Sequence, residues 1–284
     1  MSLNAGNVLK INITLDSKDK ILEYVRKYLN NDVEINDLRA KKHKKPLIIV
    51  TPNSEQLVSA QQDTHFAKIL NWADIAIPDG IGVVFAMRYF GKKMNFSASS
   101  SSIHRIAGVD FMKDLVALAS EERVTIGLMG GQRGLAVKTY ECLHSEHSKL
   151  KGWGEDGPDI TIERNDLKFV NFDEKGQVEY FKSLAKRIGD THTQLIFVGL
   201  GAPKQEYFIE RLASHLVTLN FPIVLMSVGG SFDLISGNVK RAPHLFRLIG
   251  FEWAWRLVQE PWRWKRQLSL PRFVWLLLKS KLSG

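Results

Sequence analysis

Several polar residues of this chain stand where short apolar runs end, and one of them could act as a base. Asp79 lies in the sequence PDG, directly after the apolar run IAIP of residues 75–78. A carboxylate at the carboxyl end of a buried strand can accept a proton as a general base, because partial burial raises its pKa. An Asp beside Pro and Gly can equally stabilise a turn through its own backbone. The residues by themselves leave both roles of Asp79 open.

A glycine-rich segment could bind a phosphate. Gly130, Gly131 and Gly134 follow the apolar run of residues 124–129 and precede a helical pattern. Backbone N–H groups and the helix dipole at such a junction can hold an anion. The spacing is neither GxGxxG nor that of a P-loop, and tight packing of a strand on a helix also requires glycines. Gly130 and Gly131 are therefore candidates for a phosphate site, with packing as the alternative.

Two further polar positions could meet a ligand. Gln205 follows Pro203 at the start of a predicted helix, where its side chain could reach a bound molecule, whereas the neighbouring Glu206 could merely complement the helix dipole. Arg105 could bind an anionic substrate or form a surface salt bridge. The sequence contains no HxH, HxxxH, CxxC or DxD pattern, so no metal site is predicted.

Hydrophobic patterning predicts the strands and helices that would position these residues. Continuous apolar runs are typical of parallel strands buried on both faces, and amphipathic helical patterns separate them. Strands that alternate with helices of this length predict an α/β fold, a Rossmann-like parallel sheet with helices on both faces. Ligands bind such sheets at the carboxyl ends of the strands, which is where the polar loops lie. The predicted strands are residues 47–50, 75–78, 124–129, 195–200 and 223–228, with a weaker pattern at 160–163.

The C-terminal 45 residues differ in composition from the rest. The chain has a net charge of +9, and residues 240–284 hold ten Lys or Arg against two acids, together with five of the seven Trp residues. Interleaved Trp and cations suit an anionic membrane surface or a nucleic acid, while a docked helix with a solvated basic face is the plain alternative. The longest apolar run there, FVWLLL, is too short to span a bilayer. We predict a catalytic domain at 1–240 and a C-terminal helical appendage at 241–284.

Composition and length exclude other classes. The 284 residues are 44 % hydrophobic and 24 % charged, as in ordinary globular proteins, which argues against a disordered or fibrous chain. No signal sequence opens the chain, and the lone Cys142 suits a reducing compartment. These features predict a cytoplasmic location.

The loops also carry a family resemblance. The chain resembles the WecG/TagA/CpsF family of bacterial glycosyltransferases over residues 47–267, with every motif in order, whereas the first 45 residues match weakly. The segments that carry the resemblance are TPNSEQ (51–56), ADIAIPDGIGVV (73–84), RIAGVDF (105–111), GLMGGQRG (127–134), FVGLGAPKQE (197–206), VGGSFDLISGNVKRAP (228–243) and FEWAWRLVQEPWRWKRQ (251–267).

The resemblance implies inverting, metal-independent transfer of N-acetylmannosamine, its uronic acid or a related hexose from a UDP-sugar to an undecaprenyl-diphosphate-linked sugar, in surface polysaccharide biosynthesis. No cofactor is implied, since the UDP-sugar is a substrate. Asp79 would be the catalytic base. The implied substrate-binding residues are Thr51, Asn53 and Gln205 in the sugar pocket, Arg105, Asp233 at the nucleotide, and Arg256, Arg263 and Arg266 at the diphosphates.

The charge pattern agrees with this reading. Both implied substrates are anionic, and in the absence of a DxD motif arginines could neutralise the UDP leaving group. The appendage would then hold the enzyme on the inner face of the cell membrane as a peripheral protein. No nucleic-acid partner is expected, and a homo-oligomer is left open. The alternatives are a nucleic-acid-binding protein that uses the basic tail and a dinucleotide-dependent oxidoreductase that uses MGGQRG.

Overall fold

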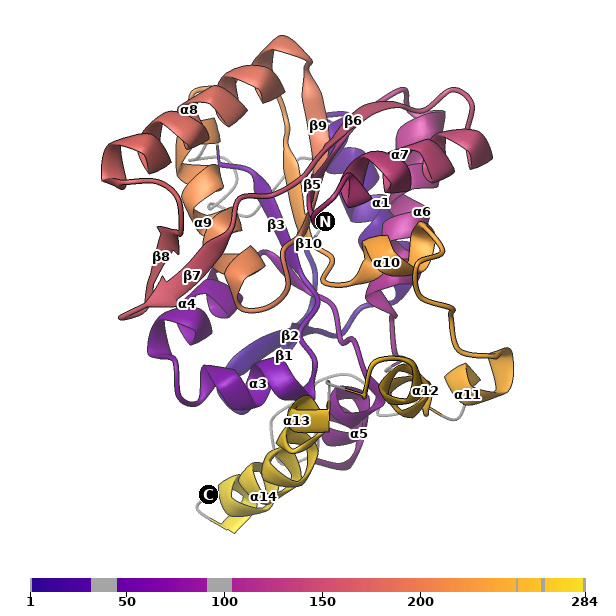
Figure 1. Ribbon diagram of the computed structural model, residues 1–284. Coiled ribbons are helices and arrows are strands. Elements are labelled where there is room, and N and C mark those ends of the chain that lie inside the picture. The colour runs from indigo at the N-terminus through magenta and orange to yellow at the C-terminus, as the bar shows by residue number, and fades with distance from the viewer. Residues whose placement is uncertain (1, 32–44, 91–103, 249, 262–263, 283–284) are drawn as a thin grey trace.

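A six-stranded parallel sheet forms the centre of the molecule (Figure 1). The computed structural model describes residues 2–31, 45–90, 104–248, 250–261 and 264–282. The strand order is β4-β3-β10-β9-β5-β6, and every neighbouring pair is parallel. The α/β, Rossmann-like prediction is confirmed. The strands are β3 (Leu47–Val50), β4 (Ile75–Ala76), β5 (Thr125–Gly130), β6 (Lys151–Glu155), β9 (Thr193–Gly199) and β10 (Val224–Ser227).

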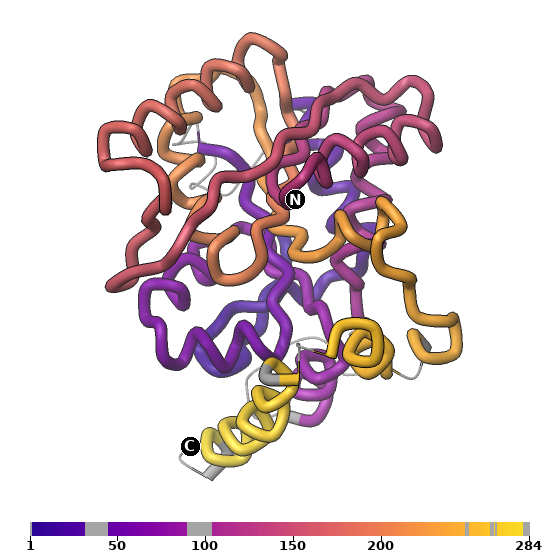
Figure 2. The backbone as a smooth tube through the Cα atoms, viewed as in Figure 1, coloured from indigo at the N-terminus to yellow at the C-terminus, as the bar shows by residue number. Residues whose placement is uncertain are grey.

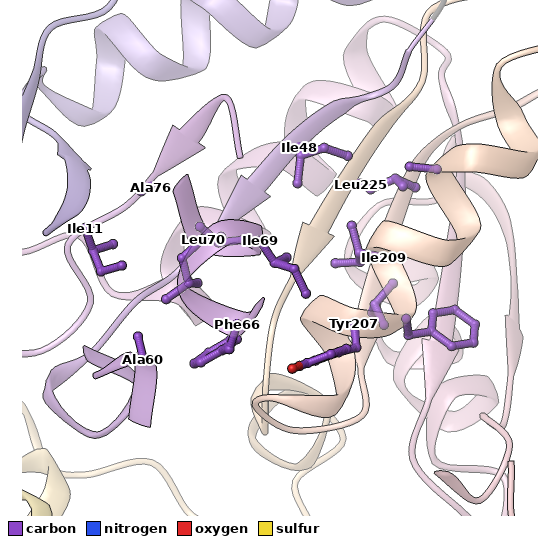
Figure 3. Close-up of a cluster of buried hydrophobic side chains, with 14 of the residues drawn as sticks. Ile11, Ile48, Ala60, Phe66, Ile69, Leu70, Ala76, Tyr207, Ile209 and Leu225 are labelled. Carbon is purple, nitrogen blue, oxygen red and sulfur yellow. The ribbon is translucent and has the colours of Figure 1, made fainter. Parts of the chain in front are cut away.

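Helices cover both faces of the sheet, because alternate residues of the buried strands point to opposite sides. In β3, Ile48 packs into one hydrophobic cluster and Ile49 into the other. Figure 3 shows part of the first cluster, where Phe66 and Ile69 lie opposite Tyr207 and Ile209 of a neighbouring helix. The first face carries α3 (Ser54–Ala60), α4 (Thr64–Trp72), α5 (Ile81–Phe90), α8 (Glu174–Asp190) and α9 (Lys204–Leu216), and the second carries α1 (Lys18–Leu29), α6 (Gly108–Glu121), α7 (Leu135–Glu146) and α10 (Ser231–Ile235).

Two details differ from the sequence patterns. The apolar pattern of residues 55–72 is two helices, because the Asp63 side chain accepts a hydrogen bond from the Phe66 amide and starts α4 as a new helix. The pattern at 160–163 is a strand, β7 (Ile160–Glu163), but it pairs with β8 (Asp166–Phe169) in a separate antiparallel hairpin. A further hairpin joins β1 (Ala5–Val8) and β2 (Ile11–Thr14).

The described residues of the C-terminal segment form four helices at the lower end of the molecule as viewed in Figure 2. The last of them packs against α3 through Phe273 and Leu277, each 2 % exposed. Within the described residues, no helix combines the length and the apolar character that crossing a membrane requires. The four helices are α11 (His244–Leu248), α12 (Glu252–Gln259), α13 (Trp264–Gln267) and α14 (Ser269–Leu282).

Candidate active site

The carboxyl ends of the strands open into one cavity of about 400 Å³. It is lined by the loops after β3, β4, β9 and β10, and the C-terminal helices form one wall. The structure thus brings together residues that are far apart in the sequence. Eight of the predicted site residues line this cavity: Thr51, Asn53, Asp79, Arg105, Gln205, Asp233, Arg256 and Arg266.

The loop after β3 is shaped by a helix cap. Asn53 begins α3, where its side chain accepts a hydrogen bond from the Gln56 amide while the Gln56 side chain accepts one from the Asn53 amide. This reciprocal arrangement satisfies two backbone donors that a helix start leaves unpaired. Thr51 is 7 % exposed, and its hydroxyl donates to the carbonyl of Ser227 at the end of β10. This hydrogen bond ties the loop after β3 to the end of β10.

A buried carboxyl group supports the floor from below. Glu206 accepts hydrogen bonds from the side chains of Gln205, at 2.7 Å, and Gln56, at 3.2 Å. Burial raises the pKa of Glu206 to about 7. The oxygen of the same Gln205 amide group accepts a hydrogen bond from the Gly229 N–H at 2.9 Å. Both polar atoms of this amide are therefore held in place, and its nitrogen carries a second hydrogen that a ligand could accept.

Asp79 lies at the bottom of the cavity, two residues before the start of α5. Its carboxylate is 3.6 Å from the guanidinium of Arg105 and is next to Gly108 at the N-terminus of α6. A Cβ atom on Gly108 would come within 3.3 Å of Asp79 Oδ2, so only glycine leaves the carboxylate this space. Burial raises the pKa of Asp79, an effect that Arg105 opposes and the nearby Glu252 carboxylate supports. A carboxylate whose pKa is raised is a better proton acceptor than an ordinary aspartate.

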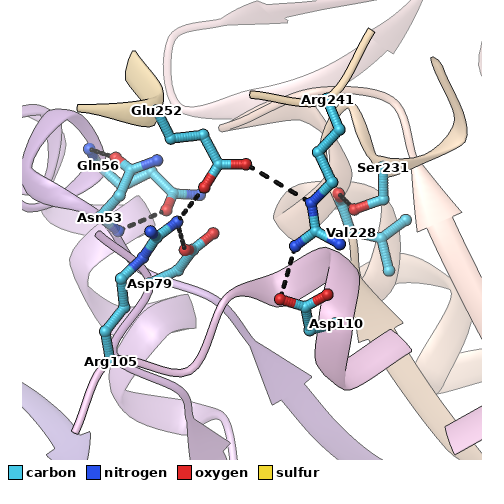
Figure 4. Close-up of polar contacts among 9 residues, drawn as sticks. All are labelled: Asn53, Gln56, Asp79, Arg105, Asp110, Val228, Ser231, Arg241 and Glu252. Atoms are coloured by element: carbon cyan, nitrogen blue, oxygen red, sulfur yellow. Dashed lines mark hydrogen bonds and ion pairs between the residues drawn. The ribbon is translucent and has the colours of Figure 1, made fainter. Parts of the chain in front are cut away.

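A chain of alternating charges joins Asp79 to the C-terminal helices (Figure 4). Arg105 donates to Glu252 at 2.7 Å, and Glu252 lies 3.9 Å from Arg241. Arg241 in turn donates to Asp110 at 2.6 Å. Burial disfavours the charge of Arg105, but Asp79 and Glu252 outweigh it and raise the pKa of this guanidinium. Glu252, the first residue of α12, thus connects the appendage to the candidate base.

Arg256 presents an unsatisfied donor to the cavity. Its Nε donates to Glu260 at 2.6 Å, while its buried Nη2 has no hydrogen-bond partner in the structure. A Cβ atom on Gly230 would lie 2.4 Å from that nitrogen, so the guanidinium rests directly on the turn after β10. A buried cationic donor without a partner is costly, and an anion in the cavity would satisfy it. Arg266 is more exposed and lies 3.6 Å from Glu55, whereas Arg263 lies outside the described residues.

A second cavity of about 660 Å³ adjoins the first, and both are lined by Gly199 and Asp233. Gly131 lines it, but its amide donates to the carbonyl of Gly199 at 3.2 Å. A Cβ atom on Gly130 would come within 2.6 Å of that carbonyl oxygen. Close packing of β5 on β9 therefore accounts for Gly130, and the Leu135 side chain, 2.8 Å from a Cβ on Gly131, accounts for the second glycine. Their role in binding phosphate stays a prediction. Three cations also line this cavity: Arg133, Lys138 and Lys204.

Sequence reasoning missed several residues of the site. Glu252, Arg241 and Asp110 are named in no predicted role, although all three lie within the segments that carry the family resemblance. Gln56 was overlooked as well, and Glu206 was assigned only to the helix dipole. Spacing of residues does not reveal the contacts of Gln56 with Glu206, of Asp110 with Arg241 and of Arg105 with Glu252, because each of the three joins segments more than 100 residues apart. In the part of the chain that the structure describes, no three His, Cys, Asp or Glu side chains gather as a metal site would require.

The fold and the cavity define an α/β protein in which a half-buried carboxylate, Asp79, faces Arg105 at the carboxyl ends of parallel strands. Comparison with known proteins identifies the class. The family model of the glycosyl transferase WecG/TagA/CpsF family matches residues 21–284. The chain belongs to this family and is a glycosyltransferase, which removes the oxidoreductase and nucleic-acid-binding alternatives as its main activity.

Two curated relatives match nearly the whole chain. A Bacillus subtilis protein named N-acetylglucosaminyldiphosphoundecaprenol N-acetyl-beta-D-mannosaminyltransferase is 31 % identical over 261 residues, which cover 92 % of this chain and 90 % of that protein. A Bacillus spizizenii protein of the same name is 33 % identical over 259 residues, covering 91 % of this chain and 89 % of its own.

Proposed function

We propose that this enzyme transfers N-acetylmannosamine, its uronic acid or a related hexose from a UDP-sugar to a sugar linked to undecaprenyl diphosphate, with inversion and without a metal ion. The observation that carries the proposal is that the half-buried carboxylate of Asp79 and the guanidinium of Arg256, whose Nη2 has no hydrogen-bond partner, line the same cavity. The names of the two Bacillus proteins support the lipid-linked acceptor and the N-acetylmannosamine donor group.

In the proposed reaction, a hydroxyl group of the acceptor sugar attacks the anomeric carbon of the donor. Asp79 accepts the hydroxyl proton while the new C–O bond forms on the face opposite the departing UDP. The bond between the anomeric carbon and the phosphate oxygen breaks, and its electron pair leaves with UDP. Arg256 and Arg266 neutralise the charge that develops on the diphosphate. Single displacement of this kind inverts the anomeric centre.

In this proposal the second cavity binds the nucleotide of the donor. Its lining includes Arg133, Lys138 and Lys204, which would contact the phosphates or the ribose, and it shares Asp233 with the first cavity. A nucleotide there would direct its sugar toward Asp79. Residues 1–240 would then form the catalytic domain, and 241–284 an appendage that completes the site and holds the enzyme on the inner face of the cell membrane.

The test is turnover by the purified full chain. N-acetylglucosamine diphosphate on a short lipid serves as acceptor, and a panel of UDP-sugars serves as donor, with product detected by mass spectrometry. We expect one UDP-sugar to give product, with the same rate in EDTA. Absence of product from every UDP-sugar, together with absence of thermal stabilisation by UDP, contradicts the proposal. Loss of activity in EDTA that Mg²⁺ or Mn²⁺ restores contradicts the metal-independent part.

A further inference from the structure

Helix α5 is apolar on both its inner and its outer face. Its ten residues, IGVVFAMRYF, include one charge, Arg88. Val83, Ala86 and Met87 are buried in the first hydrophobic cluster, as expected of the inner face of a helix. The opposite stripe carries Ile81, Phe85 and Tyr89 at a spacing of four residues, with 46 %, 53 % and 72 % of each residue exposed. A helix that is apolar all round is typical of a protein core or of a membrane contact.

Helix α5 lies beside the C-terminal helices (Figure 1). Ile81 lies against Gly250 at the entrance to α12, since a Cβ atom on that glycine would be 3.0 Å from the Ile81 side chain. A Cβ atom on Gly82 would lie 3.7 Å from the Phe273 ring of α14. The aromatic rings of Phe85 and Tyr89 stack with centroids 5.2 Å apart. We call α5 together with α11–α14 the apolar end of the molecule.

Exposed apolar side chains concentrate at this end. Among the large hydrophobic residues that the structure describes as exposed, three lie on α5 and ten follow residue 244, whereas five are scattered over the rest of the described chain. Single exposed hydrophobic residues are ordinary on protein surfaces, but a contiguous group marks an interaction site. The group also contains Trp253, Trp264 and Trp275, and Trp is the residue that favours the interface between bilayer and water.

We propose that α5 is part of the membrane-binding surface, so that an anionic bilayer is contacted by the catalytic domain as well as by the appendage. Charge complementarity supports this occupant. Residues 240–284 carry ten cations and two acids, and each cation near an anionic bilayer favours binding. A second copy of the chain would instead bring two strongly basic ends together, and like charges across an interface oppose association.

The position of α5 would bring the bilayer close to the active-site cavity. Its first residue, Ile81, stands two positions after Asp79 and lines the cavity. A membrane that contacts Phe85 and Tyr89 therefore lies within about two helical turns of the base, given a rise of 1.5 Å per residue. The inference rests on the proposed function in one respect: a lipid-linked acceptor presents its diphosphate at the headgroups, so the enzyme must reach the membrane surface to use it. Its test requires no acceptor.

The first experiment measures vesicle binding of the full chain by co-sedimentation, with vesicles of phosphatidylglycerol and phosphatidylcholine. The double variant Phe85→Gln/Tyr89→Gln is expected to lower the partition coefficient at least about tenfold, equivalent to about 1.4 kcal/mol. The matched control is Val170→Gln/Val178→Gln, which replaces two exposed side chains outside the apolar end; it should bind as the wild type does. Binding by the α5 variant equal to wild type overturns the proposal, as does an equal loss in the control.

A second experiment detects contact between α5 and the membrane directly, in a protein that still binds vesicles. Cys142 is the only cysteine, so a bimane label can be attached to Phe85→Cys in a Cys142→Ser background, with Val178→Cys as control. We expect the emission of the label at position 85 to shift to the blue when vesicles are added, and the control to stay unchanged. A blue shift that appears without vesicles and grows with protein concentration would identify a second copy of the chain as the occupant and overturn the proposal. Absence of any shift when vesicles are added also overturns it.

These outcomes separate the surface from the activity. Phe85 and Tyr89 line neither cavity, so their double variant should turn over a short-lipid acceptor at the wild-type rate. If no UDP-sugar is turned over by the wild type, the proposed function fails while vesicle binding still decides the role of α5. If turnover is normal but vesicle binding is insensitive to α5, only the present inference fails.

Discussion

The strand-end loops and the C-terminal helices line the same cavity, but different forces hold them. The loops are tied to one another by buried hydrogen bonds, such as those from Thr51 to Ser227 and from Gly229 to Gln205. The appendage meets the cavity through ion pairs at its edge, including Arg105 with Glu252 and Arg266 with Glu55.

The candidate base Asp79 and the candidate diphosphate-binding arginines therefore belong to regions that are held in different ways. Asp79 follows β4 and lies next to Gly108 at the N-terminus of α6, both within the first 240 residues. Arg256 reaches the cavity only because α12 lies across the turn after β10. Partly exposed ion pairs are weaker than buried hydrogen-bonded networks. Substitutions in the two regions should therefore affect the reaction in distinguishable ways.

The largest effect is expected at the base. Asp79→Asn keeps the shape of the side chain but removes proton acceptance, and general-base catalysis typically contributes about 10²- to 10⁴-fold. Turnover should fall by that factor while UDP still binds, as measured by titration calorimetry. A rate within a few-fold of wild type would remove Asp79 from the mechanism.

The next effect concerns stability of the cavity floor. The pKa of Glu206 is about 7 in the folded chain, above its ordinary value, so the folded state retains a proton that the unfolded chain loses at lower pH. The stabilising contribution is present in acid and is lost as the pH rises through 7, by on the order of 3 kcal/mol.

Glu206→Gln should abolish that loss. The difference in free energy of unfolding between variant and wild type, measured by urea titration, should move in favour of the variant between pH 4.5 and pH 8. Other groups titrate alike in both proteins and cancel. A difference that does not change with pH would show that Glu206 ionises at its ordinary pKa.

The appendage is tested by changing Arg256, Arg263 and Arg266 to Gln and assaying a diphosphate acceptor with a short lipid. If the three arginines complete the site, turnover should fall at least about tenfold, the effect of losing about 1.4 kcal/mol in the transition state. Lys175→Gln/Lys182→Gln, on exposed positions of α8, provides the control for altered charge. A normal rate in the triple variant would confine these arginines to membrane attachment.

The smallest effect is expected at Glu252. Asp79 must be ionised to accept a proton, so activity falls as the pH drops through its raised pKa. The negative charge of Glu252 contributes to that increase, and Glu252→Gln should move the acid limb of the pH–rate profile to lower pH, with a loss of less than about tenfold on the plateau. The control Glu174→Gln lies on α8, far from the cavity. An unchanged acid limb would show that Glu252 only docks α12.

Much of the fold followed from short-range patterning. The buried strand β3 was recognisable because its four residues are all apolar, and α9 because its apolar positions repeat at helical spacing. The strand β6, KGWGE, escaped recognition because only Trp153 among its residues is buried. Its two glycines allow Tyr140 and Ala136 of α7 to pack closely, a tertiary reason that no local pattern records.

For the site, the sequence determined which residue types stand at the ends of strands, since a parallel sheet places those ends at one edge whatever the rest of the chain does. It also determined the basic, Trp-rich character of the appendage. Only the tertiary structure decided that Glu252 bridges Arg105 and Arg241, that Glu206 is buried beneath Gln205, and that α5 extends the apolar end. Such contacts depend on how separate helices dock, and docking follows the shape and charge of whole surfaces rather than the order of residues.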